Sequence, residues 1–114
     1  MHSWHDVVCF ACSLPDVIMA PFYGTPCPKV NGKPLAAPGR EDGSFALFIS
    51  GIDEKLMLME TDPATFWQTD HYRNSAVVLV RYGTEAHERL ETYLKRRWWD
   101  CATEPLRRAW GERP

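Results

Sequence analysis

Apolar residues in the first fifteen positions recur with the spacing of one helix face. They follow the i, i+3, i+4 and i+7 pattern of a core-facing stripe: Trp4, Val7, Val8, Ala11 and Leu14. Ser3 can accept a hydrogen bond from a backbone N–H of the first turn, and Pro15 cannot continue a helix. The pattern therefore predicts a helix that ends at about Ser13.

Extended segments follow after a short connection. Residues 27–30 and 33–37 are joined by Asn31 and Gly32, the pair that best tolerates the positive φ angles of a type I′ turn. Residues 44–49 predict a third strand, antiparallel to the second if the loop between them folds back. We expect these strands to form a meander.

The segment 52–60 fits two structures. Ile52, Leu56 and Met59 have helical spacing, whereas the Leu-Met-Leu-Met run would also suit a buried strand. We favour the helix because Leu, Met, Glu and Lys are good helix formers.

The next elements are a turn and a strand. Asp62 and Pro63 fit an N-cap followed by the first position of a short helical turn that ends at Phe66. An extra short strand at 66–69 is the other possibility for this region. Residues 76–82 are β-branched and almost entirely apolar, which predicts a central strand.

A last long helix is predicted to begin at Thr84. Acidic residues lie in its first turns and basic residues near its end, as the helix dipole favours. Glu85 with Arg89 and Glu91 with Lys95 form i, i+4 pairs on one side. The other side carries the core-facing residues: Ala86, Leu90, Tyr93, Leu94, Arg97, Trp98 and Cys101. A short final helix follows at 106–110.

Strands grouped together, with helices before and after, indicate an α+β domain. We expect a two-layer α/β sandwich with an antiparallel sheet and helices on one face, in the order α-β(3)-α-β(1-2)-α. A chain of 114 residues is about one domain by length, so residues 1–114 are interpreted as one unit.

Composition and charge exclude several classes of protein. Fifteen acidic and thirteen basic residues give a net charge of −2, which argues against a dedicated nonspecific nucleic-acid binder. Apolar runs are far shorter than the roughly 20 residues that cross a bilayer, so we expect no membrane partner. No export signal is visible, which predicts a cytoplasmic location. We favour a monomer and expect no cofactor. In that compartment the four cysteines are expected to be free thiols.

Basic residues gather in two places. The first group surrounds the predicted hairpin turn and the loop after it: Lys29, Lys33 and Arg40. The second lies near the end of the last long helix, before two tryptophans: Lys95, Arg96 and Arg97. A β-ribbon can present such charges to phosphates, and basic residues between tryptophans can also stack on bases. The alternatives are a solvated hairpin edge and cations that stabilise a helix C-terminus.

Histidines and cysteines share a narrow face of the first predicted helix: His2, His5, Cys9 and Cys12. Only neighbours such as His5 and Cys9 could bind one ion, because the helix rises 1.5 Å per residue and the donor atoms must all lie within about 2.3 Å of a metal. A redox Cys-x-x-Cys pair normally begins a helix, whereas this one lies near the predicted end. We therefore interpret these cysteines as ordinary thiols and predict no metal.

Blocks along most of the chain are similar to those of one family. The most specific are Asp-Pro-x-x-Phe at 62–66 and Asp-His-Tyr-Arg at 70–73, with weaker ones at 23–26, 31–36, 41–44 and 78–81. On these blocks the chain resembles the MmcQ/YjbR family. The tail departs from the pattern: relatives tend to have Ala-Pro-Lys-Arg where this chain has Ala-Thr-Glu-Pro-Leu-Arg-Arg at 102–108.

The resemblance implies a two-layer domain of the type compared with secretion chaperones, and DNA binding through wing-like projections. No nucleophile elbow, phosphate-binding glycine loop or His-Glu-x-x-His pair is present, so we expect a non-enzymatic binding domain. DNA is the first expected partner, bound weakly and in a salt-sensitive way. The alternative is a small-molecule or peptide pocket beside the Asp-His-Tyr-Arg block, with these lining residues: Tyr23, His71, Tyr72 and Arg73.

Overall fold

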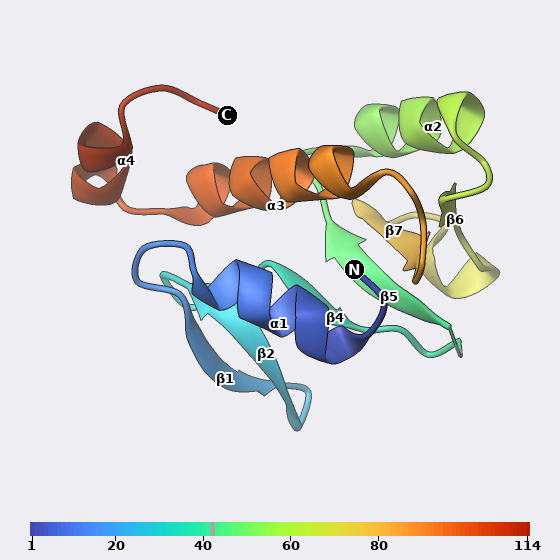
Figure 1. The fold of residues 1–114 in the computed structure, drawn as a ribbon, viewed down its shortest axis with the longest axis horizontal. Helices are drawn as coiled ribbons and strands as arrows, with labels where there is room; N and C mark the ends of the chain where they lie inside the picture. Colours follow the sequence, from blue (N-terminus) through green and yellow to red (C-terminus); the bar gives the residue numbers. More distant parts are fainter. Residues whose placement is uncertain (42) are drawn as a thin grey trace.

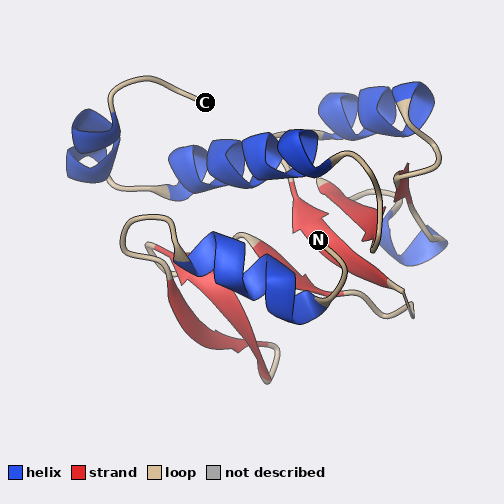
Figure 2. Ribbon diagram, in the orientation of Figure 1, coloured by secondary structure: helices blue, strands red, loops and turns tan. Residues whose placement is uncertain are grey.

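Helices and antiparallel strands occupy separate layers of the molecule (Figure 1 and Figure 2). A computed structural model describes residues 1–41 and 43–114. The helices within these ranges are α1 (Trp4–Cys12), α2 (Ile52–Thr61), α3 (His87–Cys101), α4 (Glu104–Trp110) and the 3-10 helix η1 (Asp70–Tyr72). The strands are β1 (Ile18–Phe22), β2 (Thr25–Val30), β3 (Lys33–Pro34), β4 (Ala36–Pro38), β5 (Ser44–Phe48), β6 (Phe66–Trp67) and β7 (Val77–Arg81). The predicted α+β class is confirmed.

Helix α1 forms as the sequence predicts. The Ser3 side chain accepts a hydrogen bond from the Asp6 backbone N–H at 3.3 Å, which caps the first turn. Val7, Ala11 and Leu14 are buried on the inner face. In Figure 1, α1 lies in front of β2 and β4, so its apolar stripe covers the strands.

The first sheet has the order β1-β2-β3 and includes a strand that the sequence did not predict. Strand β1 occupies what was interpreted as a connection. Two turns of the same kind join the three strands: Tyr23 and Gly24 have φ angles of 49° and 81°, and Asn31 and Gly32 have 52° and 74°. Positive φ at both central residues is the geometry of a type I′ turn. The predicted Asn-Gly hairpin is therefore confirmed, and a second hairpin precedes it.

Prolines explain why the strands divide into two sheets instead of one meander. Pro26 and Pro28 in β2 have no N–H to donate to the neighbouring β4. Leu35 makes the connection between the sheets: its N–H donates to the Pro28 carbonyl at 2.9 Å, and its carbonyl accepts from the Phe48 N–H at 3.3 Å. The expected single sheet is thus two sheets that meet at Leu35.

The second sheet has the order β4-β5-β7-β6, with all neighbours antiparallel. Strands β5 and β7 lie in the middle, which confirms the prediction of a central strand near residue 80. Side chains alternate between the two faces: Val78 and Val80 belong to the main core, whereas Val77 and Leu79 belong to a smaller cluster on the opposite face. The strands therefore have one face toward the main core and one face directed away from it.

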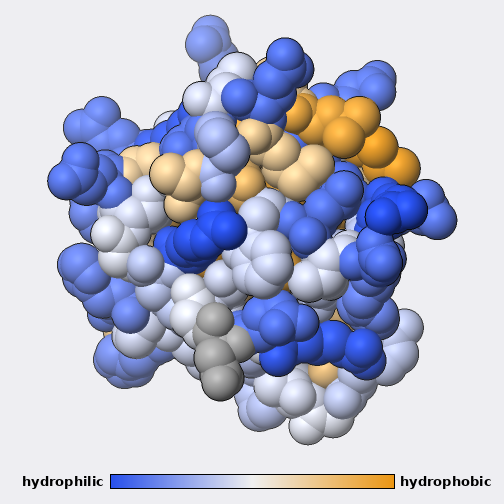
Figure 3. Space-filling view, turned by 90° about the vertical axis from the view of Figure 1, so that its right-hand side faces the viewer, coloured by the Kyte–Doolittle hydropathy of each residue, from blue (hydrophilic) through white to orange (hydrophobic). Residues whose placement is uncertain are grey.

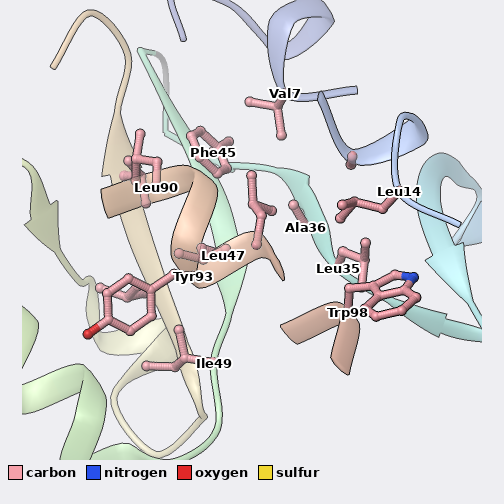
Figure 4. Close-up of a cluster of buried hydrophobic side chains, with 14 of the residues drawn as sticks. Val7, Leu14, Leu35, Ala36, Phe45, Leu47, Ile49, Leu90, Tyr93 and Trp98 are labelled. Carbon is pink, nitrogen blue, oxygen red and sulfur yellow. The ribbon is translucent and has the colours of Figure 1, made fainter. Parts of the chain in front are cut away.

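The main core lies between the helices and one face of the strands (Figure 4). Trp98 is the largest buried side chain, and its indole N–H donates to the Pro15 carbonyl at 2.8 Å. This bond fixes the end of α3 against the turn that follows α1. Figure 4 shows Leu14, Leu35 and Trp98 close to one another, where the two sheets join.

Helix α2 confirms the helical interpretation of residues 52–60. Asp62 has two roles: its backbone N–H donates to the Leu58 carbonyl and ends α2, and its carbonyl accepts from the Thr65 and Phe66 N–H groups at 3.2 and 3.0 Å, which opens the predicted short turn. A turn follows, and Phe66 begins the short strand β6. The outer face of α2 leaves Ile52 and Leu56 partly exposed, and Figure 3 shows hydrophobic side chains gathered at the top of the molecule, where α2 lies.

Helix α3 begins at His87, three residues later than predicted. Thr84 adopts another role, because its hydroxyl accepts from the Ala86 N–H and bonds the Thr65 hydroxyl at 2.6 Å. The predicted pairs of Glu85 with Arg89 and Glu91 with Lys95 are absent from the ion pairs of the described residues. Arg89 donates to the Thr61 hydroxyl at 3.1 Å, which connects α3 to α2. Within residues 1–41 and 43–114, no helix is long and apolar enough to span a membrane.

Candidate functional site

A pocket of about 600 Å³ lies on the face of the strands that is directed away from the main core. This size is within the range of small-ligand sites. The β1–β2 hairpin forms one side, and the segment around η1 forms the other. The described lining residues are Phe22, Tyr23, Thr25, Cys27, Ala37, Pro38, Arg40, Ala46, Phe48, His71, Tyr72, Ser75 and Val77.

Aromatic rings from two strands and a turn form the hairpin side of the pocket. The Phe22 ring packs edge-on against Tyr23, with centroids 4.7 Å apart, and against Phe48, with centroids 5.6 Å apart. Tyr23 is held in the turn at positive φ and is 95% exposed. A ring so exposed at the pocket mouth offers a free face for stacking.

The other side presents a histidine and an arginine together. The His71 and Tyr72 rings pack edge-on with centroids 4.7 Å apart. The Arg40 Nη1 lies 3.4 Å from His71 Nδ1, although 31 residues separate them in the chain. The loop after β4 thus brings a guanidinium next to an imidazole at the pocket wall.

A buried lysine holds this wall in position. Lys55 on α2 is fully buried, and its Nζ donates to three backbone carbonyls: Tyr72 at 2.8 Å, Arg73 at 3.2 Å and Ser75 at 2.6 Å. Burial lowers the pKa of Lys55. Because the three bonds lie within four consecutive residues, they fix the path of the chain from η1 to β7, and with it the place of Tyr72.

The electrostatics of the pocket favour a negative ligand. Arg40 is the only Lys or Arg among the described lining residues, and no carboxylate is found in that set. The floor is apolar, because Ala46 and Val77 point up from β5 and β7. Hydroxyls of Thr25 and Ser75 add donors at the sides. The site can therefore hold a flat apolar body with an anionic group near Arg40.

Three of the four residues predicted for a pocket lie on it, namely Tyr23, His71 and Tyr72. Arg73 does not line it; its guanidinium pairs with Asp70 at 2.5 Å on the surface. Sequence reasoning missed Phe22, which lies in a segment interpreted as a connection, and Phe48, which was interpreted as an ordinary strand residue. It also missed Lys55, whose one signal was a charged residue three positions before the buried Leu58.

The predicted nucleic-acid residues do not form one surface of free cations. Arg40 lines the pocket, and Lys29 donates to the Pro21 carbonyl at 2.6 Å. The Lys95 Nζ lies 6.0 Å from the Phe10 ring centroid. Arg96 donates to the Pro114 carbonyl at 2.8 Å, and Arg97 to the Pro34 carbonyl at 3.0 Å. This last bond brings the end of α3 beside β3, which begins at Lys33.

The cysteines are all free thiols. Cys9 Sγ lies 3.4 Å from His5 Nε2, but no group of three metal-ligating side chains occurs among the residues that the structure describes. Cys27 and Cys101 are buried, and burial raises the pKa of both thiols.

Comparison of the chain with models of known protein families, with curated proteins and with solved structures gives no match.

Proposed function

We propose that this chain is a non-enzymatic binding domain whose pocket holds a small, flat, negatively charged ligand. One observation carries the proposal: aromatic rings of the hairpin and of η1 line a common cavity together with Arg40 and His71, whose Nη1 and Nδ1 atoms lie 3.4 Å apart. A ring of the ligand stacks on Tyr23 or Tyr72, and its anionic group accepts hydrogen bonds from Arg40. Charge-assisted bonds of this kind are among the stronger ones in proteins.

Titration with 2-naphthoate, followed by amide chemical shifts, tests the proposal. We expect shifts confined to the hairpin, to residues 37–40, to residues 70–77 and to β5, because those segments line the pocket. The neutral analogue 2-naphthamide has the same ring system without the charge, so it should bind more weakly. Shifts elsewhere on the surface, or equal binding of the two compounds, would contradict the proposal.

Arg40→Gln provides the matched test of charge. Removal of one hydrogen bond to a charged group costs about 1.5–3 kcal/mol, which corresponds to at least a tenfold loss of naphthoate affinity. Arg108→Gln removes the same charge from α4, away from the pocket, and should leave the affinity unchanged. Equal losses in the two variants would indicate nonspecific attraction.

Membership of the MmcQ/YjbR family stays a proposal, and the pocket gives its most specific block a role. In the structure, the Asp-His-Tyr-Arg block is η1 with its following residue, and Lys55 holds its carbonyls. The free state of all four thiols supports a cytoplasmic location as part of the same proposal.

Duplex DNA is the second candidate ligand, and one observation favours it. Arg97 donates to the Pro34 carbonyl at 3.0 Å, which brings the end of α3 beside Lys33 at the start of β3. One residue from each basic group of the sequence therefore lies at this point. Retarded migration of duplex DNA by micromolar protein at about 50 mM salt, lost in a Lys33→Gln and Arg97→Gln variant, is the expected result. Unchanged migration contradicts this candidate.

A further inference from the structure

The pocket is the middle of a longer row of aromatic and basic side chains on the same face. At one end, the Arg81 guanidinium lies over the Trp67 ring, 5.0 Å from its centroid. At the other end, the Lys29 Nζ lies 5.7 Å from the Phe22 centroid. Neither Arg81, Trp67 nor Lys29 lines the pocket itself.

Strand register places these residues on one face. Trp67 is opposite Leu79, and Leu79 is opposite Ala46, which lines the pocket floor. Arg81 is two residues beyond Leu79, so it points to the same side. Neighbouring strands lie about 4.8 Å apart, so Trp67 is roughly 10 Å from Ala46 across the sheet.

The hairpin continues the row on the other side. Cys27 of β2 lines the pocket. Lys29 is two residues further along the same strand, so its side chain points to the same face as that of Cys27. The Lys29 ammonium crosses to the Pro21 carbonyl at 2.6 Å, which holds it beside Phe22. Arg81 is held similarly, because its Nη1 donates to the Pro63 carbonyl at 2.9 Å.

Three basic side chains lie at separated points along this row: Lys29, Arg40 and Arg81. Asp70, the carboxylate within η1, is paired with Arg73. Phosphate groups linked in a chain would meet these cations in turn, with aromatic rings between them. A basic track with interleaved rings is the usual construction of a sequence-tolerant site for single strands.

We propose that this face binds single-stranded nucleic acid, with one base in the pocket and phosphates at Lys29, Arg40 and Arg81. The inference rests on the proposed function, because the base and phosphate at Arg40 are the flat anionic ligand of the pocket. A duplex does not fit the same site, since its bases are stacked inside and cannot reach a cavity lined by Tyr72 and Phe48. A free nucleotide would fill the pocket without reaching Lys29 or Arg81.

Fluorescence anisotropy with a labelled twelve-nucleotide oligothymidylate tests this, with thymidine monophosphate and a twelve-base-pair duplex as competitors. We expect the oligonucleotide to bind about tenfold or more tightly than the monophosphate, and the duplex to compete poorly. Equal affinity for oligonucleotide and monophosphate would overturn the proposal in favour of a free nucleotide. Equal affinity for the duplex would overturn it in favour of a double-stranded ligand.

A variant with Lys29→Gln and Arg81→Gln tests the ends of the row. It should lose about tenfold in affinity for the oligonucleotide and reduce the slope of affinity against salt by about 1.4, which is 0.7 for each lost phosphate contact. Binding of 2-naphthoate should stay within about twofold, because neither residue lines the pocket. The control variant, with Arg108→Gln and Arg113→Gln, removes the same amount of charge in and after α4 and should leave the affinity for the oligonucleotide nearly unchanged. Equal losses of affinity in the two double variants overturn the proposal.

Two further measurements distinguish the possible outcomes. If the Lys29 and Arg81 variant does not fold, amide shifts of the wild-type protein with the oligonucleotide replace it. Shifts at β6, β7 and the hairpin support the proposal, and shifts confined to α3 and α4 overturn it. Binding of 2-naphthoate without binding of the oligonucleotide overturns this inference alone, whereas loss of both overturns the proposed function as well.

Discussion

Substitution of Lys55 by methionine removes a buried ammonium while nearly preserving the shape of the side chain. The three carbonyls that it bonds, those of Tyr72, Arg73 and Ser75, then lose their donor. An unsatisfied buried acceptor costs about 1–3 kcal/mol. Residues 72–75 are exposed or half-buried, so their carbonyls can regain water and the lower value applies.

Three acceptors at about 1 kcal/mol each give a loss of about 3 kcal/mol. About 1 kcal/mol of this loss is offset, because a charge is no longer buried and the methionine side chain is apolar. We therefore expect Lys55→Met to lower the free energy of unfolding by about 2 kcal/mol. This is a large share of the 5–15 kcal/mol that is typical of such a domain.

Urea unfolding followed by tryptophan fluorescence measures the global loss, and amide hydrogen exchange locates it. Exchange should accelerate most at residues 70–76, because Lys55 holds that segment. Affinity for 2-naphthoate should fall at the same time, since Tyr72 loses its fixed position. A change of less than about 0.5 kcal/mol, with unaltered exchange at 70–76, would refute the reasoning.

The free energy of unfolding should also depend on pH, in a direction that the burial of Lys55 determines. Burial lowers the pKa of Lys55 below its ordinary value of 10.5, so the folded state releases this proton at lower pH than the unfolded state does. Between the two pKa values the unfolded state binds more protons, and stability therefore rises with pH. The free energy of unfolding of wild type, relative to Lys55→Met, should increase in alkaline solution as the pH approaches 10.5. A decrease over this interval contradicts the assignment.

Other predictions concern thiols and a turn. The exposed Cys9 and Cys12 should react quickly with a thiol reagent, whereas the buried Cys27 and Cys101 should react only when the protein unfolds; four equal rates in the native protein would contradict their placement. Gly32→Ala should destabilise the protein by about 1 kcal/mol, because φ at this residue is +74°, and thermal unfolding measures the loss. An unchanged melting temperature would show that the turn relaxes without cost.

Sequence reasoning succeeded where one local signal determined the structure. The cap at Ser3 and the Asn31–Gly32 turn depend on neighbouring residues only, so both were predictable. Strand β1 was missed because Pro21 lies within it and Tyr23, at positive φ, replaces the asparagine or glycine that normally indicates a turn.

The site was predictable only in part, for a physical reason. His71 and Tyr72 stood out as adjacent polar and aromatic residues, but their partner Arg40 depends on the path of a loop. Lys55 depends on tertiary structure alone, because its acceptors are backbone carbonyls 17 to 20 residues away. No side-chain pattern in the sequence marks a backbone acceptor.

The prolines of the hairpin also bear on how the protein behaves at high concentration. In an antiparallel strand, the backbone N–H and C=O groups of alternate residues bond the partner strand, and those of the residues between them point away from it. Phe22 and Thr25 are the bonded pair beside the turn, so the backbone groups of Met19 and Pro21 point away from β2. Pro21 has no N–H, and its carbonyl already accepts from Lys29. A second chain that approached β1 would therefore find backbone partners only at Met19. This edge therefore offers an added strand too few backbone groups for a continuous ladder, and we expect the hairpin to resist edge-to-edge growth without a covering helix.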